Sequence, residues 1–189
     1  MTGVWSLPRS ARFGGREYPV HADFREVLDI LEGLKDPDEP EFIRWRVALA
    51  LFYEGFEEMP AAHWGEAMAW LARFLNGGRE EEVAKPAPQL LDWEQDAPAI
   101  LADVNKAAGC EVRALPFLHW WTFLSFFNAI GEGQLSALVG IRDKLRRGKP
   151  LEKWEKEYYR DNKARVDLKP RYSREELAEQ ERLKKLLGE

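Results

Sequence analysis

The residues of this chain that could carry out chemistry are few and lie far apart. Its histidines are His21, His63 and His119, and none of them has a second ligand residue at a spacing typical of metal sites. His119 lies between apolar neighbours, which favours a buried histidine that holds a backbone or carboxylate partner over a catalytic one, because no other catalytic group is nearby in the sequence. The single cysteine, Cys110, excludes an intramolecular disulfide and a cysteine-rich zinc site in this chain, and it fits a reducing cytoplasm.

Asp92, Glu94 and Asp96 form a small cluster of candidate ligands. They could bind a cation, but carboxylates also stabilise the start of a helix, and that explanation is the simpler one. The pairs Gly14-Gly15 and Gly77-Gly78 lack the further lysine, hydroxyl or glycine residues of a phosphate-binding loop. Because no catalytic constellation is present, the sequence predicts a protein that is not an enzyme and that carries no metal and no cofactor.

Composition and charge limit the classes of protein to which this chain can belong. With 189 residues, 45% of them hydrophobic and 32% charged, the chain is typical of one soluble domain with an appendage. The net charge is -5, but residues 146–189 hold 14 lysines and arginines against 10 aspartates and glutamates. Those charges are interleaved and the aromatic residues among them show no stacking repeat, so nucleic acid is a weakly supported partner. The N-terminus has no basic flank followed by an apolar run, so no secretory signal is expected.

One apolar stretch, 115–131, is expected to organise the fold, because it has no charge and carries six aromatic rings besides His119. It is predicted to be the central, buried helix, with Pro116 in its first turn and Gly131 at its end. As a membrane span it would reach only about 24 Å, short of the ~30 Å hydrocarbon core, so burial in a globular fold is favoured. The residues expected in the core are Phe24, Trp45, Trp93, Leu118, Trp120, Trp121, Leu124 and Phe127.

The elements before that stretch follow from periodicity and from start and stop signals. A β-hairpin is expected over 12–20, turning at Gly14-Gly15 and packing through Trp5, Phe13 and Tyr18. The predicted helices span about 23–35, 40–55 and 59–76, and 79–91 is predicted to be an exposed linker. The first helix is expected to begin with a capping box of Asp23 and Glu26, and the second to place Trp45, Leu49 and Phe52 inward with Phe42 beside them.

A further helix is expected immediately before the central one. Asp92 could cap its start, in which case Pro98 would kink the helix, or Pro98 could move the start to Asp96. Gly109 is expected to end it.

After the central stretch, residues 134–145 are predicted to form a helix with Leu138, Ile141 and Leu145 inward. The short connection before it predicts an antiparallel neighbour of the central helix.

The C-terminal part is predicted to form two polar helices, about 150–164 and 173–187, the latter capped by Ser173 and Glu176. The expected fold class is therefore all-α with a small N-terminal β-hairpin: a compact helical bundle around the central helix, plus a helical extension. The predicted division is a core domain over 1–148 and a polar C-terminal extension over 149–189.

Four stretches carry a resemblance to a known family: Gly14–Arg25, Asp92–Asp96, Leu118–Phe123 and Ile141-Arg142. In order and spacing they are similar to a family from tailed bacteriophages and prophages, across about residues 5–145. Its members are encoded close to the tape-measure gene and are regarded as tail-assembly chaperones, or simply as phage tail proteins. The chain departs from the usual family pattern at Gly109–Val112 and at Pro98.

The resemblance implies a non-enzymatic helical protein of the host bacterial cytoplasm. It would bind the long, aggregation-prone tape-measure protein, help to recruit the tail-tube protein, and be missing from the mature virion. Two alternatives stay open: a structural tail-completion or connector protein of the virion, and a nucleic-acid-binding helical adaptor. The sequence also leaves open a homo-oligomer.

A chaperone for an apolar helix needs exposed apolar surfaces with charge around them. Trp70 and Phe74 lie on a second apolar side of the helix over 59–76, and we expect them to meet a partner. The last helix offers a thin apolar seam that includes Leu177, Leu183 and Leu186.

Overall fold

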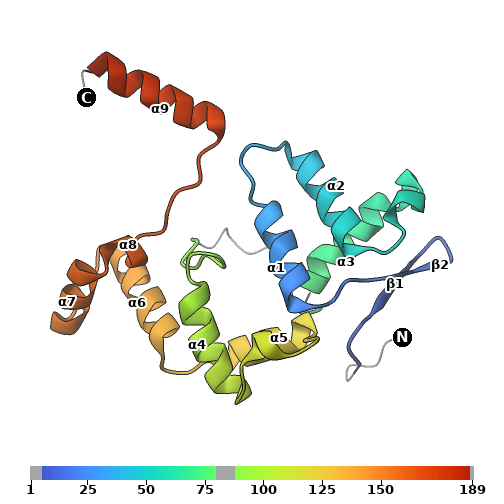
Figure 1. The fold of residues 1–189 in the computed structure, drawn as a ribbon, viewed down its shortest axis with the longest axis horizontal. Coiled ribbons are helices and arrows are strands. Elements are labelled where there is room, and N and C mark those ends of the chain that lie inside the picture. The colour runs from blue at the N-terminus through green and yellow to red at the C-terminus, as the bar shows by residue number, and fades with distance from the viewer. Residues whose placement is uncertain (1–5, 80–87, 188–189) are drawn as a thin grey trace.

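The structure is a computed structural model that describes residues 6–79 and 88–187. It is mostly helical, with a two-stranded antiparallel hairpin near the N-terminus (Figure 1). The predicted fold class is confirmed to that extent, whereas a bundle around one central helix is not. Trp5 and most of the predicted linker over 79–91 lie outside the described residues.

The hairpin forms as predicted. Its strands are β1 (Ser10–Phe13) and β2 (Arg16–Pro19). Gly14 and Gly15 have φ angles of 53° and 81°, the left-handed conformation that a two-residue turn requires. Phe13 and Tyr18 are buried, and both meet the edge of Tyr53 at the end of the second helix, with ring centroids 5.6 and 6.5 Å apart. The hairpin is therefore held by aromatic packing on the helices, because a hairpin alone is marginally stable in water.

Three helices pack beside the hairpin. They are α1 (Phe24–Gly33), α2 (Glu41–Phe52) and α3 (Trp64–Leu75), with the short turns η1 (Phe56–Glu58) and η2 (Ala61–His63) between the last two. The second helix ends earlier than predicted, because Tyr53 is extended and joins Val20 in a β-bridge. Gly55, expected at the helix end, instead starts η1 with a φ of 70°. Phe42, expected beside the inner stripe, is 71% exposed, so that expectation was wrong.

The helix α4 (Ala97–Ala108) begins at the later of the two predicted starts. Asp96 is its N-cap residue, and Pro98 occupies the second helical position, where a missing backbone N–H breaks no helical hydrogen bond. Gly109 ends the helix with a φ of 70°, as predicted.

The helix α5 (Trp120–Asn128) is shorter and less enclosed than predicted. Residues 115–119 are not helical: the carbonyl of Leu118 accepts a hydrogen bond from the backbone N–H of Phe24, so this segment lies extended against the start of α1. Pro116 therefore precedes the helix, and the helix ends before Gly131. Of its nine residues only Trp120 and Phe123 are buried, which corrects the expectation of a central helix covered on most sides.

The chain continues through α6 (Gln134–Arg146), α7 (Lys153–Asp161) and α8 (Lys163–Val166). The helix α6 packs on α4 and α8, which corrects its predicted pairing with the central helix (Figure 1). Leu138 and Ile141 are fully buried together with Val166, whereas Leu145, expected inward, is 37% exposed. Because α8 contributes to this small cluster, the segment after Gly148 packs on the preceding helices. The predicted division into a core domain over 1–148 and an extension over 149–189 stays a prediction.

The last helix, α9 (Arg174–Leu187), stands apart from the other helices (Figure 1). Its predicted capping box is confirmed. The backbone N–H of Ser173 donates to the Glu176 carboxylate at 2.8 Å, and the backbone N–H of Glu176 donates to the Ser173 hydroxyl at 3.2 Å.

The main hydrophobic core lies where the hairpin, α1 to α3, α4 and α5 meet. Of the residues expected there, Phe24, Leu118 and Trp120 are buried, and Phe24 stacks on Phe123 with ring centroids 4.7 Å apart. The others are half-buried and pack against the same core: Trp45, Trp93, Trp121, Leu124 and Phe127.

Candidate functional site

Asp23 joins the start of α1 to the segment before α5. Its side chain accepts the backbone N–H of Arg25 at 3.0 Å and the backbone N–H of Leu118 at 2.9 Å, and it also binds the Arg25 guanidinium. Burial works to raise the pKa of Asp23, but the hydrogen bonds from Arg25 and Leu118 outweigh it and hold the pKa below its usual value. Asp23 therefore caps the helix as predicted, whereas Glu26 pairs with His21 at 3.2 Å.

His119 is a structural residue at the start of α5. Its Nδ1 accepts the backbone N–H of Trp121 at 3.0 Å, so its Nε2 carries the proton and donates to the carbonyl of Pro8 at 2.9 Å. The residue is 2% exposed, and burial lowers its pKa, with a smaller opposing effect of the Pro8 carbonyl. The expected buried histidine with a backbone partner is confirmed.

Trp120 and Trp121 hold the C-terminal end of α3. Nε1 of Trp120 donates to the carbonyl of Leu75, and Nε1 of Trp121 donates to the carbonyl of Phe74, both at 2.9 Å. The last carbonyls of a helix lack intrahelical partners, so these two indoles satisfy them. The Leu-His-Trp-Trp stretch is thus a junction that ties together α1, α3, α5 and the N-terminal segment.

The acidic residues Asp92 and Asp96 have different structural roles. One Asp92 carboxylate oxygen accepts the backbone N–H groups of Glu94 and Gln95 at 3.0 and 2.9 Å, which closes the turn before α4. Asp96 points instead toward α6. In the part of the chain that the structure describes, no three histidine, cysteine, aspartate or glutamate side chains are grouped as a metal ion would need.

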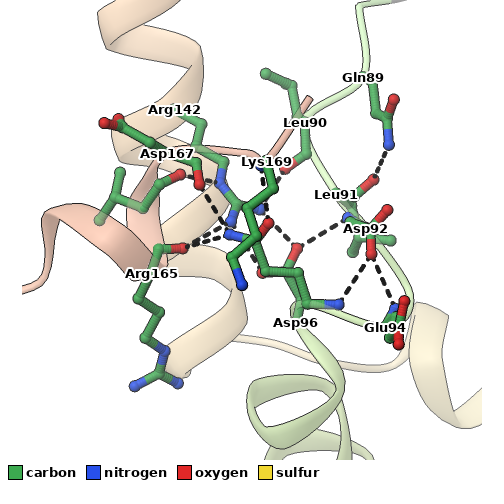
Figure 2. Close-up of polar contacts among 12 residues, drawn as sticks. Gln89, Leu90, Leu91, Asp92, Glu94, Asp96, Arg142, Arg165, Asp167 and Lys169 are labelled. Atoms are coloured by element: carbon green, nitrogen blue, oxygen red, sulfur yellow. Dashed lines mark hydrogen bonds and ion pairs between the residues drawn. The ribbon is translucent and has the colours of Figure 1, made fainter. Parts of the chain in front are cut away.

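Among the ion pairs of residues 6–79 and 88–187, the most buried joins Arg142 and Asp96 (Figure 2). Nη1 and Nη2 of Arg142 donate to the two Asp96 carboxylate oxygens at 2.6 and 2.9 Å. The remaining guanidinium N–H groups donate to the carbonyls of Val166, Leu90 and Arg165 at 2.6, 3.0 and 2.9 Å. All five donors of the guanidinium are used, so the pair joins α4, α6 and α8 and has no donor left for a substrate.

The neck, residues 167–173, links α8 to α9 and is held by polar contacts. The Gln95 side chain donates to the carbonyl of Asp167 at 2.8 Å and accepts the backbone N–H of Lys169 at 3.0 Å. Arg171 forms ion pairs with Glu32 and with Asp92, the latter at 3.2 Å. Polar contacts at a surface are screened by salt, so the neck is a weak attachment compared with a packed core.

The leucine seam of α9, defined as Leu177, Leu183 and Leu186, is exposed. The three side chains are 48%, 49% and 75% exposed. The start of α9 is tied to the α1–α2 turn by Arg174, whose backbone N–H donates to Asp38 at 2.6 Å. The seam thus lies on a helix that contacts the rest of the molecule at its first residue.

The second apolar side of α3 is a core face, which corrects one predicted surface. Phe74 is 1% exposed, stacks on Trp70 with ring centroids 5.4 Å apart, and lies 4.9 Å from the ring of Phe52. Trp70 is half-buried and packs against Phe52 and Tyr53. The end of α2 covers this side of α3, so Phe74 has no surface to offer a partner.

The sequence reasoning missed an exposed apolar surface on α2. We define the α2 outer face as Ile43, Val47, Ala50 and Leu51, on the side opposite the buried residues of this helix. Val47 and Leu51 are 48% and 50% exposed, Ala50 is exposed, and Ile43 is half-buried. The signal was present as apolar residues repeating every four positions, at 43, 47 and 51, outside the inner stripe.

Two hollows flank α5. One, of about 300 Å³, is lined by apolar side chains of α1, α4 and α5, including Leu28, Leu101 and Phe123. The other, of about 590 Å³, lies between the end of α3 and α5 and includes Leu75 and Trp121. The wall of the first hollow is mainly apolar, which suits apolar contact better than chemistry. The wall of the second is mixed, because polar side chains such as Thr122, Ser125 and Asn128 join its aromatic and aliphatic ones.

A family model described as bacteriophage Gp15 protein matches residues 5–168. The chain belongs to this bacteriophage family. No curated protein and no solved structure matches the chain.

The Gp15 match covers both structural centres described above. It includes the Leu-His-Trp-Trp junction and the Arg142–Asp96 pair, and it ends at residue 168, within the neck. The helix α9 and its leucine seam therefore lie beyond the region shared with the Gp15 family model. Within residues 6–79 and 88–187, none of the helices of this Gp15-family chain has the length and apolar character needed to cross a bilayer.

Proposed function

We propose that this Gp15-family protein is a non-enzymatic tail-assembly chaperone that binds the tape-measure protein in the host cytoplasm. Three features support the proposal: the bacteriophage family, the resemblance of the central stretches to tail-assembly chaperones, and the exposed leucine seam of α9. The bacteriophage family carries most weight, because it covers residues 5–168, whereas α9 lies beyond the matched region. The exposed leucines, which are spread around α9, add apolar surface for contact with another helix.

The exposure of the seam indicates how strongly one molecule would bind. Full burial of a leucine contributes roughly 1.5–3 kcal/mol, and about half of each side chain is still available at Leu177 and Leu183. Three such residues give on the order of 3–5 kcal/mol before the entropy of association, about 4–15 kcal/mol, is subtracted. The leucines alone therefore do not hold a partner, and the proposed complex needs a further contact.

The remaining surfaces give the proposed complex a second contact. Recruitment of the tail-tube protein, implied by the resemblance, would need an apolar surface separate from the α9 seam, and Trp70 or the hollows beside α5 are the candidates. Release before the virion is completed is part of the same proposal.

The test is co-expression with the tape-measure protein of the same phage, affinity capture of this chain and size-exclusion chromatography. The proposal expects a soluble tape-measure protein that co-elutes, and loss of co-elution for the double variant Leu183→Glu, Leu186→Glu. Ala178→Glu is the matched control, because it adds the same charge to α9 at an exposed position about 90° or more from the centre of the seam. Point variants are preferable to a cut at Gly148, which would remove Val166 and the carbonyl partners of Arg142.

An insoluble tape-measure protein, with this chain eluting alone, would overturn the chaperone proposal. Mass spectrometry of purified particles then decides the alternative: stoichiometric presence in virions indicates a structural tail-completion or connector protein.

A further inference from the structure

The smaller hollow beside α5, which we call the α1–α4–α5 hollow, is an apolar recess with two cations in its lining. Its volume is about 300 Å³, which is within the range of sites that bind small apolar groups. Leu28, Leu101 and Phe123 line it, one from each helix, and the charged residues of its lining are Arg25 and Arg113. This composition suits an apolar group that carries a polar or charged atom at one end.

The wall of the hollow that contains Arg113 is held in place by side chains of α1 and α4. The Arg25 guanidinium donates to the carbonyls of Arg113 and Leu115 at 3.3 and 3.1 Å, which ties the short turn η3 (Val112–Ala114) to the start of α1. Asn105 of α4 also holds this turn, because its side-chain oxygen accepts the first backbone N–H of η3 at 2.9 Å. The hollow is therefore preformed, and a ligand does not have to order its walls on binding.

Arg113 has hydrogen-bond donors that the fold leaves unused. Its Nε and Nη2 donate to the two Glu111 carboxylate oxygens at 2.8 and 2.9 Å, which fixes the guanidinium along one edge. Its Nη1 carries two more N–H groups, and these have no acceptor among residues 6–79 and 88–187. The Arg113 side chain is 60% exposed, so a group that arrives from solvent can reach these donors.

The lining indicates the chemistry of the occupant. The apolar walls favour a leucine or phenylalanine side chain, because the gain on binding comes from removing apolar area from water. A carboxylate is the acceptor that gains most from Nη1 of Arg113, since a hydrogen bond between charged groups is about twice as strong as one between neutral groups. A protein segment supplies both groups when an aspartate or glutamate lies one helical turn from the apolar residue.

We propose that the α1–α4–α5 hollow is a docking site for the tape-measure protein, which inserts one apolar side chain into it and places a neighbouring carboxylate on Nη1 of Arg113. The inference rests on the proposed function for the identity of this partner, and it supplies the further contact that the exposed leucines of α9 require. The lining residues of the hollow fall within residues 24–123, inside the region matched by the Gp15 family model.

The first test uses 4-phenylbutyrate as a probe, because this molecule joins one apolar ring to one carboxylate. Two-dimensional NMR of the full chain is recorded as the probe is added to about 10 mM, and we expect the Trp93 indole N–H signal to shift with a Kd of about 1–10 mM. Trp93 reports on the site because it lines the hollow. The amide of the same probe should bind about threefold more weakly, since Arg113 is partly exposed to water.

Two substitutions in α4 show whether the probe occupies the hollow. Ala97 lines the hollow, so Ala97→Leu fills part of its volume and should weaken binding of the probe by about tenfold or more. Ala102→Leu is the matched control, because Ala102 is exposed on the same helix and is not part of the lining. Circular dichroism and the melting temperature of both variants should match those of the wild type.

Arg113→Gln separates the carboxylate contact from the apolar contact. This variant should bind the acid and the amide equally, because the charged donor is lost while the apolar walls remain. Lys106→Gln removes the same charge from an exposed position on α4 and should keep the preference for the acid. A merely structural role of Arg113 would instead lower the affinity for both probes alike.

Co-expression with the tape-measure protein tests the docking role. Ala97→Leu should reduce co-elution, whereas Ala102→Leu should leave it at the wild-type level. Unchanged co-elution of Ala97→Leu would overturn the docking role.

The site and the proposed function fail separately in these experiments. A Trp93 signal that does not shift at about 10 mM probe, or binding that Ala97→Leu leaves unchanged, would overturn the site even if the wild type co-elutes with the tape-measure protein. Absence of co-elution for the wild type would overturn the proposed function and the docking role together, and binding of the probe would then leave a site for an apolar carboxylate.

Discussion

Arg142 on α6 and Asp96 at the start of α4 form a buried ion pair with two hydrogen bonds, of 2.6 and 2.9 Å. Their side chains are 5% and 0% exposed, and the other guanidinium N–H groups are satisfied by backbone carbonyls (Figure 2). Such a pair tolerates burial only because every donor has an acceptor. It fixes the position of α6 on α4 and brings α8 to both.

Asp96→Asn tests this pair with little change of shape. The substitution leaves the Arg142 charge buried without its counter-charge, so we expect the free energy of unfolding to fall by about 3–5 kcal/mol, measured by urea denaturation. Asp143→Asn is the control, because Asp143 pairs with Arg146 and Arg147 on the exposed side of the same helix. Equal effects of the two substitutions would contradict a special role of the buried pair.

Asp23 is expected to make the fold sensitive to acid. Its pKa in the folded protein lies below the usual value, so the stabilisation is present above about pH 4 and is lost as the pH falls through the lowered pKa. Asp23→Asn removes this titration. The free energy of unfolding of the wild type should therefore drop more steeply than that of Asp23→Asn between about pH 5 and about pH 2.5. Parallel pH profiles would show that Asp23 gains nothing from its hydrogen bonds.

His119 gives a second pH dependence, in a higher range. Burial lowers its pKa below the ordinary value of 6.5, so protons bind more readily to the unfolded chain. Stability is therefore full above about pH 6.5 and declines as the pH falls below it, until the folded histidine also binds a proton. His119→Asn keeps an N-cap acceptor for Trp121 and removes the titration. The difference in unfolding free energy between wild type and variant should shrink from about pH 7.5 to about pH 5.5, and a constant difference would exclude this account.

Gly78 lies against Trp121, where a larger residue does not fit. Its φ is 83°, and a Cβ atom would lie 2.7 Å from the indole ring that binds the end of α3. We expect Gly78→Ala to lower the free energy of unfolding by about 1–3 kcal/mol. Gly65→Ala is the matched control: it lies in the first turn of α3, a Cβ atom there meets no neighbour within 4 Å, and the substitution should stabilise the protein by about 0.5–1 kcal/mol.

Arg171 is expected to control how firmly the neck is held. Arg171→Gln removes the ion pairs with Glu32 and Asp92, so backbone amides in the neck should exchange hydrogen faster, while those in α4 and α6 should not change. About 1 M salt should produce the same local effect in the wild type, because the screening length falls to about 3 Å. Arg182→Gln serves as the control, since Arg182 is 75% exposed on α9. If the neck amides of Arg171→Gln exchanged hydrogen as slowly as those of the wild type, contacts other than the Arg171 ion pairs would be holding the neck.

Features that depend on neighbouring residues were predictable from the sequence. The turn at Gly14-Gly15, the helix end at Gly109 and the capping box of Ser173 with Glu176 all involve groups within a few residues of one another. Their geometry follows from local backbone sterics and short-range hydrogen bonds, so composition and spacing were enough. The Gp15 family was likewise accessible, because its stretches can be read along the chain.

The candidate surfaces were predicted less completely. The leucine seam of α9 is exposed as the sequence indicated, because the helix carries too few apolar residues to be drawn into a core. Phe74 was assigned to a partner, and the α2 outer face was overlooked, because periodicity shows that a helix has two apolar sides without showing which one a neighbour covers.

Only the tertiary structure decided the contacts between residues that lie far apart in the chain. Residues 115–118 are apolar enough for a helix. The backbone N–H of Leu118 instead binds the side chain of Asp23, which lies 95 residues earlier in the chain at the start of α1. The helix α5 therefore begins only after Leu118. The sequence by itself determined the local elements and the family of this protein. Folding decided three further features: where α5 begins and ends, which helices α6 packs on, and which apolar surfaces stay exposed. These features depend on which distant groups the fold brings together, because a buried hydrogen-bond donor must find an acceptor wherever the fold places one.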